Sequence, residues 1–266
     1  MKYHPDFVNE YKFDENISIE IDINGIKFSF QVFQNIGQKF FNEEKCRTIL
    51  KEFIEIIKKY PKIDRRKINI IVYDIPKKKQ LPAKKQYIES KHINSGYCYP
   101  TSTSDDINIV IYRREEFYKV LIHELLHFFD IIPYNQELQT LYANMFSSVP
   151  NINVNEAIVE LYAIHINCEI ISRLKNKDLK QLLEIEYNFS ITQCKKLLKQ
   201  QDVDIFDIVK NTFTWNENTN AFSYFILKHI FLHFILKKSI DELYDKLNER
   251  TINSKNMNIQ LSKNSI

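Results

Sequence analysis

The sequence predicts an α+β fold in which a small mixed-sheet lobe is followed by a helical lobe. Three observations indicate this fold class. All segments with strand character lie within residues 17–112, the chain after Pro133 has helical periodicity, and an apolar helix with two histidines lies between these regions. At 266 residues the chain is at the upper end for one domain. We therefore expect residues 1–134 and 135–266 to be two lobes of one compact unit.

The first expected elements are a β-hairpin and a helix. Residues 17–23 and 26–33 alternate apolar and polar side chains on either side of Asn24-Gly25, a dipeptide that favours a tight hairpin turn. From Asn42, which is a good N-cap, apolar residues recur at helical spacing as far as a proline.

Two buried strands and a long loop come next. Residues 67–75 and 107–112 are short segments rich in β-branched side chains, as in buried strands. Residues 76–106 show no strong period, so we expect a loop that lines the cleft. Glu115 and Glu116 then fall in the first turn of the histidine helix, where acidic side chains suit the positive end of the helix dipole.

The second half of the chain is predicted to be entirely helical. The expected helices cover residues 136–146, 154–174, 179–186, 192–199, 205–212, 221–236 and 240–247. The polar tail after Arg250 is expected to fray. Because the histidine helix lies where the two lobes meet, we expect a cleft beside it.

The composition is that of a globular protein, with 44% hydrophobic and 27% charged residues. A formal net charge of +3 is too small to indicate nucleic-acid binding. One basic loop, residues 76–85, is interpreted as a solvated surface, with an acidic partner, a targeting role or a nucleic acid as weaker alternatives.

Several features point to the compartment. No stretch has the apolar length of a secretory signal or a membrane span, so we expect a soluble, intracellular protein, for example a cytoplasmic one. The cysteines are scattered without a C-x-x-C pair, which favours free thiols in a reducing compartment. They are Cys46, Cys98, Cys168 and Cys194.

The strongest functional signal is the H-E-x-x-H motif at residues 123–127. His123 and His127 are four residues apart on a predicted helix, so they lie on one face and can both bind one metal ion. Zinc takes neutral imidazole nitrogens at about 2 Å, and Glu124, just off that face, would point toward a water on the metal. The motif therefore predicts a catalytic Zn²⁺ site.

Catalytic zinc usually has three protein ligands, so a third must come from elsewhere in the chain. The downstream candidates are Glu137, Glu156, Glu160, His165 and Glu169. Glu156 and Glu160 are the best of these, because they lie one turn apart on a predicted helix and share a face that could turn toward the histidines.

These two segments together resemble a known family. The H-E-x-x-H motif followed by Asn155-Glu156-Ala157-Ile158-Val159-Glu160 is similar to the motif pair of the gluzincin metallopeptidases, the thermolysin-like zinc peptidases. The resemblance implies a zincin-like metallopeptidase fold, a Zn²⁺ cofactor and Glu156 as the third ligand. It also implies that Glu160 orients His123 from outside the ligand set. The two motifs are farther apart in this chain than in thermolysin.

A second register resembles another group of zinc peptidases. Asp130, three residues after the second histidine, together with Glu160-Leu161-Tyr162-Ala163, is similar to the pattern of anthrax lethal factor and related peptidases. In that register Glu160 is the ligand and Glu156 lies outside the ligand set.

A tetrahedral oxyanion normally has a second hydrogen-bond donor besides zinc. The candidate donors are Tyr142, Tyr162, Tyr224, His229 and His233. Tyr224 and His229 are preferred because both lie on the predicted helix 221–236. His229 and His233 repeat the spacing of four residues without a glutamate between them. A packing role for this pair is therefore favoured over an oxyanion role or a second metal site.

The segment from His92 to Tyr97 has two interpretations. A plain turn at Ser95-Gly96 is favoured. The alternative is an edge strand to which a peptide substrate adds by backbone hydrogen bonds.

The leading hypothesis is a zinc-dependent metallopeptidase that hydrolyses a peptide or protein substrate, with Glu124 activating the zinc-bound water. A zinc hydrolase of non-peptide amides would use the same residues and differ only in the shape of the cleft. A catalytically silent binding protein with this fold is a third hypothesis, disfavoured because a purely structural zinc site has no use for Glu124. The sequence carries no signal for oligomeric state.

Overall fold

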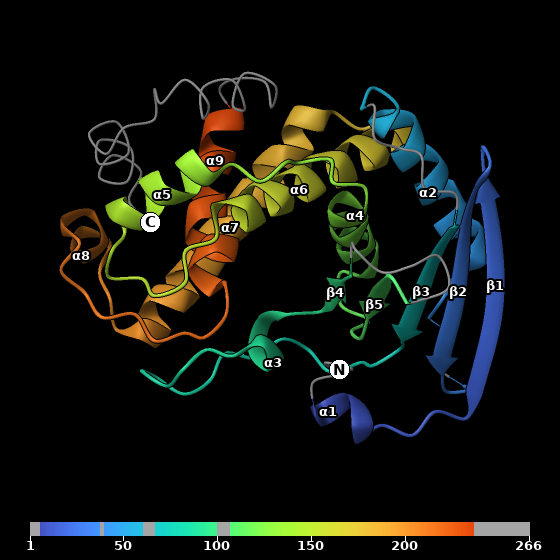
Figure 1. The fold of residues 1–266 in the computed structure, drawn as a ribbon, viewed down its shortest axis with the longest axis horizontal. Helices are drawn as coiled ribbons and strands as arrows, with labels where there is room; N and C mark the ends of the chain where they lie inside the picture. The colour runs from blue at the N-terminus through green and yellow to red at the C-terminus, as the bar shows by residue number, and fades with distance from the viewer. Residues whose placement is uncertain (1–5, 38–39, 61–66, 100–106, 237–266) are drawn as a thin grey trace.

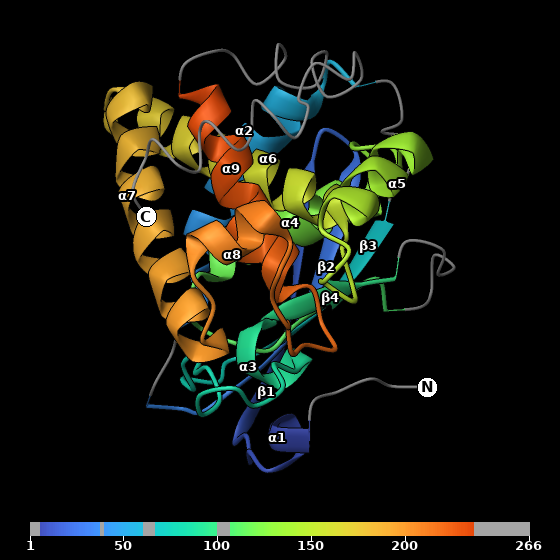
Figure 2. The same cartoon turned by 90° about the vertical axis from the view of Figure 1, so that its left-hand side faces the viewer.

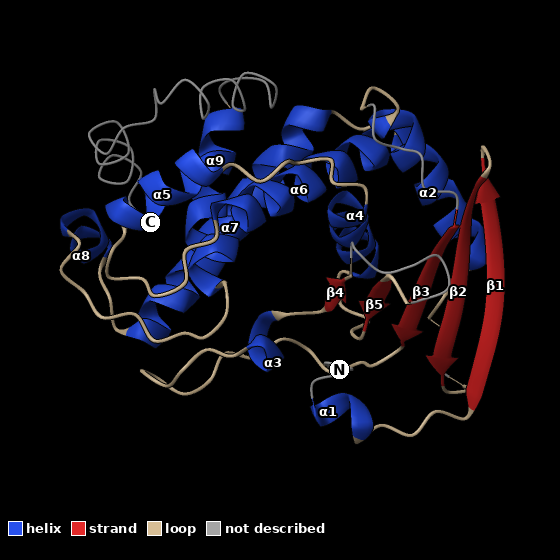
Figure 3. Cartoon of the chain, viewed as in Figure 1, coloured by secondary structure: helices blue, strands red, loops and turns tan. Residues whose placement is uncertain are grey.

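The protein is a mixed α/β structure with a five-stranded mixed sheet and several helices. The computed structural model describes residues 6–37, 40–60, 67–99 and 107–236. The sheet lies at one end and the helices that follow it extend from its inner face (Figure 1, Figure 3). The strands are β1 (Glu15–Ile23), β2 (Ile26–Gln34), β3 (Lys67–Tyr73), β4 (Gly96–Cys98) and β5 (Ile109–Ile111). The prediction of a mixed sheet followed by helices is confirmed at this level.

The strand order is β1-β2-β3-β5-β4, which puts β4 at an edge. The two outer pairs, β1 with β2 and β5 with β4, are antiparallel, whereas β2, β3 and β5 run parallel. The β1–β2 hairpin closes at Asn24-Gly25 with positive φ angles of 54° and 86°, as the dipeptide predicts. The segment 76–106, expected to be a loop, contains the edge strand β4 and the short helix α3 (Ser90–Ile93).

Helices cover both faces of the sheet. On the inner face lie α2 (Glu43–Ile57) and α4 (Phe117–Phe128), packed on alternate strand residues such as Phe28 and Ile70. The helix α2 begins as expected, with the Asn42 side chain accepting a hydrogen bond from the Lys45 amide at 2.8 Å. On the outer face the short helix α1 (Asp6–Asn9) packs Phe7 against the opposite side chains of β3 and β5.

The second half of the described chain is helical. Its elements are α5 (Gln136–Met145), α6 (Val154–Lys175), α7 (Leu179–Gln201), α8 (Ile205–Lys210), the π-helix η1 (Phe222–Leu227) and α9 (Lys228–Ile235). Two expectations were wrong in detail. Residues 179–186 and 192–199 belong to one continuous helix, because no Gly or Pro interrupts it, and residues 222–227 have π rather than α geometry. The expected helix 240–247 and the tail after Arg250 lie outside the described residues.

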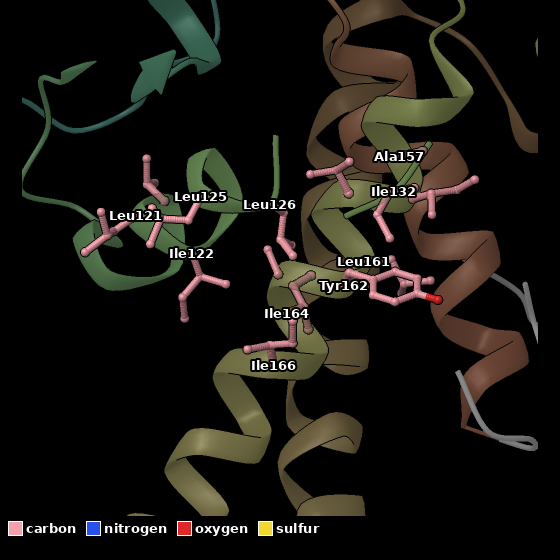
Figure 4. Packing of buried hydrophobic residues seen from close by; sticks show 14 of the residues in the cluster. Leu121, Ile122, Leu125, Leu126, Ile132, Ala157, Leu161, Tyr162, Ile164 and Ile166 are labelled. Atoms are coloured by element: carbon pink, nitrogen blue, oxygen red, sulfur yellow. The ribbon is translucent and has the colours of Figure 1, made fainter. Parts of the chain in front are cut away.

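The helix α6 is central to the helical region. It is buried along most of its length and packs against α4, α7, η1 and α9. Figure 2 shows α7 and α9 beside it on the helical side of the molecule. Figure 4 shows Leu126 of α4 on the side of that helix toward Ile164 of α6. A single apolar cluster thus includes residues on both sides of the junction at residue 134.

None of the described helices combines the length and the hydrophobicity that a membrane crossing requires.

Candidate metal centre

The two histidines of the H-E-x-x-H motif lie side by side on α4. Their ring centroids are 4.9 Å apart, as expected for residues one helical turn apart. The helix itself begins later than expected, at Phe117. Glu116 precedes it in a left-handed conformation with φ of 57°, so neither Glu115 nor Glu116 lies in the first turn.

Glu156 of α6 faces both histidines. Its Oε1 lies 2.8 Å from His123 Nε2, and its Oε2 lies 3.5 Å from His127 Nε2. Local sequence fixes where α6 begins, because the Asn153 side chain caps it by accepting from the Glu156 amide at 3.0 Å. One ligand atom from each of the three residues lies within 4.8 Å of the others.

These three side chains fit a zinc ion by their chemistry. Two imidazoles and one carboxylate form the donor set of many catalytic zinc sites. All three are at least three-quarters buried, and they direct their donor atoms at one another rather than at solvent. In the part of the chain that the structure describes, no other three His, Cys, Asp or Glu residues converge in this way.

Glu160 lies behind His123. Its Oε2 is 3.0 Å from His123 Nδ1, and its Oε1 accepts from Lys119 Nζ at 2.9 Å. Lys119 also reaches Glu116 at 3.3 Å. Both oxygens of Glu160 are therefore engaged away from His127. A hydrogen bond to Nδ1 fixes the orientation of an imidazole so that Nε2 is free to bind a cation.

The pKa of His123 reflects the two carboxylates around it. Burial lowers this pKa, but hydrogen bonds to Glu156 and Glu160 outweigh burial and raise it to about 10 when no cation is bound. The pKa of Glu156 is likewise set by two opposing effects. Burial raises it, but hydrogen bonds to the two histidines outweigh burial and lower it below its usual range. A buried carboxylate of this kind would be compensated by a cation as well as by protonated imidazoles.

Glu124 is buried beside this group. Burial raises its pKa to about 7, although His123 and His127 act in the opposite direction. A carboxyl group with a pKa near neutrality can both take up and release a proton. Glu124 is in no ion pair among the described residues, and it lines the cavity described next.

A cavity of about 470 Å³ lies against the metal centre. His123, Glu124 and Glu160 line it, as do Phe189 of α7 and Tyr224 of η1. The expectation that the long loop lines a cleft is met, because residues 78, 79, 81 and 92–96 also line it.

Two loop features that the sequence analysis missed shape this cavity. A Cβ added to Gly96 of β4 would lie 2.9 Å from Val110 O and 3.1 Å from Glu124 Oε1, so only glycine lets the edge strand run this close to Glu124. Arg113, fully buried, donates to the carbonyls of Lys77, Lys91 and Asn94 and holds the loop in place. The favoured interpretation of Ser95-Gly96 as a plain turn was wrong, because Gly96 begins the edge strand.

Tyr224 is the oxyanion candidate that the fold brings to the centre. Its ring centroid lies 5.9 Å from that of His123, and it lines the cavity. Burial raises the pKa of the Tyr224 hydroxyl above its ordinary value, and the charges of Glu156 and Glu124 raise it further. The phenol therefore stays protonated and can donate a hydrogen bond.

His229, the other preferred candidate, lies elsewhere. It stacks on Tyr187 of α7 with ring centroids 4.9 Å apart and does not line the cavity. The reason is helical geometry, because Lys228, four residues after Tyr224, occupies the cavity side of the helix instead. His233 also contacts Tyr187, with Nδ1 3.1 Å from the tyrosine hydroxyl.

The remaining candidates are not part of the metal centre. Tyr142 packs against Phe146 and Phe231 in the core. Tyr162 is buried among apolar side chains (Figure 4). Asp130 lies on the surface with a φ of 48°, just after α4 ends. These three, with Glu137, His165 and Glu169, do not join the group of His123, His127 and Glu156.

The basic loop 76–85 is partly neutralised. Lys84 and Lys85 both pair with Asp202 at the end of α7, at 2.6 Å and 2.8 Å. Lys79 pairs with Glu116 at 3.0 Å. Its charges are therefore directed largely at the protein itself.

Comparisons with known proteins add little to these observations. No family model matches the chain, and no curated protein sequence matches it. Among solved structures, the crystal structure of an aminopeptidase N family protein from Idiomarina loihiensis aligns with a TM-score of 0.42 and 10% sequence identity. The alignment covers 90% of this chain and 42% of that protein, so the chain spans less than half of its length. A similarity at this level establishes neither a family nor an activity.

Proposed function

We propose that this protein is a zinc-dependent metallopeptidase with a zincin-like fold, in which His123, His127 and Glu156 hold the metal and Glu124 is the catalytic base. The observation that supports this is the convergence of the three donor groups within 4.8 Å, beside a buried Glu124 that faces a cavity. When bound, zinc would polarise a scissile carbonyl and lower the pKa of water toward about 7.

Three other side chains would assist the reaction. Glu124, with its pKa near 7, takes a proton from the attacking water and passes it to the leaving amine. Glu160 keeps the proton on Nδ1 of His123 and so fixes the ring. Tyr224, which lines the cavity beside His123, donates a hydrogen bond to the oxyanion. A peptide or protein is the proposed substrate. A non-peptide amide would use the same groups.

Two measurements on purified protein test the proposal. A mixture of blocked peptides should be cleaved by the zinc-loaded protein, and a chelator should stop the cleavage. The variant Glu124→Gln should retain zinc but lose roughly 100-fold or more of the turnover, because the base is removed while the ligands remain.

A matched control is Glu137→Gln, which removes a carboxylate on α5, away from the cavity. This control should keep full turnover. If no peptide is cleaved in a chelator-sensitive way, or if Glu124→Gln cleaves as fast as wild type, the proposal is wrong.

A further inference from the structure

The cavity contains a lysine that the proposed mechanism does not use. Lys228, the first residue of α9, is 6% exposed and lines the cavity. It forms no hydrogen bond or ion pair with any described residue. A buried ammonium without a partner is costly, so its retention in the fold calls for an explanation.

The carboxylates nearest to Lys228 are already engaged by other groups. Glu160 binds Lys119 and His123, and Glu116 binds Lys119 and Lys79. Glu186 of α7 is near enough to interact through its charge but is not within ion-pair distance. Neutralising the metal centre therefore does not require Lys228.

Lys228 lines the same cavity as Tyr224, His123 and Glu124. It lies four residues after Tyr224, so both side chains reach the cavity from the same side of the helix. Phe189, Leu197 and Phe225 also line the cavity, together with charged side chains of both signs. A buried positive charge attracts an anion more strongly than one in water does.

From this geometry we propose that Lys228 forms a subsite for a carboxylate of the substrate, next to the scissile bond. The subsite rests on the proposed function, whose substrate class it narrows. Five lysines and four glutamates line the cavity, a surplus of one positive charge, so a monoanionic carboxylate suits it better than a doubly charged phosphate. The carboxylate comes either from an Asp or Glu side chain or from the C-terminus of a peptide.

The test compares matched peptides. One Glu is moved stepwise along an otherwise neutral peptide blocked at both ends, and each peptide is paired with its Gln counterpart. A second arm compares a neutral peptide that ends in a free carboxylate with the same peptide ending in an amide. A charged hydrogen bond in a buried site predicts a preference of about tenfold or more for the acidic member of one arm. The arm in which it occurs identifies the source of the carboxylate.

Binding is measured alongside cleavage, by titration calorimetry with the zinc-loaded Glu124→Gln variant and with the metal-free protein. Selective binding of the acidic peptides without any cleavage would support the subsite and contradict the peptidase proposal. Chelator-sensitive cleavage with equal rates and affinities for both members of every pair would overturn the subsite and leave the peptidase proposal intact.

Substitutions assign the preference to this side chain. Lys228→Met keeps most of the volume and removes the charge, so it should reduce the preference to about twofold or less, whereas Lys228→Arg should retain most of it. The control Lys195→Met removes an exposed charge outside the cavity and should preserve the preference. An undiminished preference in folded Lys228→Met overturns the proposal. If Lys228→Met does not fold, wild type and Lys228→Arg are compared instead. A preference for the acidic peptide of a pair in both proteins supports the subsite, and equal rates and affinities for both peptides of every pair overturn it.

Discussion

The helices α4 and α9 each carry two histidines four residues apart, and the two pairs have opposite surroundings. His123 and His127 face the carboxylate of Glu156, and a second carboxylate, Glu160, binds the far side of His123. His229 stacks on the ring of Tyr187, and burial lowers its pKa to about 4. The pKa of His123, in contrast, is raised to about 10.

The difference lies in the neighbouring helix rather than in the histidines. The helix α6 presents two acidic residues one turn apart to α4, whereas α7 presents an aromatic side chain to α9. Two imidazoles at this spacing bind a metal only when a third donor faces them, and otherwise they pack like other aromatic rings.

The largest effect is expected from removing the feature that separates the two pairs. Glu156→Ala should weaken zinc binding by more than about 100-fold, because a ligand is lost rather than an outer partner, whose loss costs about 10- to 100-fold. Competition with a chromogenic chelator measures the affinity. The control Glu169→Ala, on the same helix but outside the group, should bind zinc as wild type does. Wild-type affinity in Glu156→Ala would exclude Glu156 as a ligand.

A smaller effect on zinc affinity is expected from changing Glu160, the carboxylate behind His123. Glu160→Gln should reduce the zinc affinity by about 10- to 100-fold, since His123 loses a charged acceptor at Nδ1 but keeps its place in the ligand set. The same chelator competition applies. A loss larger than that of Glu156→Ala would exchange the roles of the two glutamates and favour the second register.

The third effect concerns the pH dependence of the metal-free protein. The contribution of His123 to the free energy of unfolding is fully present below its unfolded pKa of about 6.5. It is lost as the pH rises through about 10, the pKa of His123 in the folded protein. That of His229 is present above about 6.5 and is lost as the pH falls through about 4. The stability difference between wild type and His123→Gln should therefore shrink in alkali, and that for His229→Gln should shrink in acid.

Urea unfolding in the presence of a chelator, repeated across this pH range, measures both differences. Each should change by up to a few kcal/mol, since one pKa unit corresponds to about 1.4 kcal/mol. If the two differences changed in the same direction with pH, the contrast between the two histidine pairs would be refuted.

The sequence predicted the elements whose signals are local. The hairpin turn at Asn24-Gly25 and the cap at Asn42 depend on residues next to one another, and both are confirmed. The sequence also singled out Glu156 and Glu160 for one face of a helix. It did not predict which of them faces the histidines without the family resemblance, because that depends on how α6 is rotated against α4.

What the sequence analysis missed depends on contacts between distant residues. Gly96 is required because β4 runs beside Glu124, which no local pattern indicates. Lys228 did carry a signal, since it is a charged residue within an apolar helical stretch, but Tyr224 and His229 were considered instead. The π geometry of η1 likewise has no simple local signature, and it precedes the turn that brings Lys228 rather than His229 to the cavity.

The long loop that lines the cavity also bears on how the protein folds. The Lys85 amide donates to the Gln200 carbonyl at 2.7 Å, and Ile88 forms a parallel bridge with Glu217. These contacts close segments of more than one hundred residues, and closing such long loops costs entropy that must be met before the contacts form. The cavity wall should therefore be completed late in folding, after α4 and α6 have docked. A metal ion present during refolding would then bind to an assembled pair of helices before the substrate cavity beside it is closed.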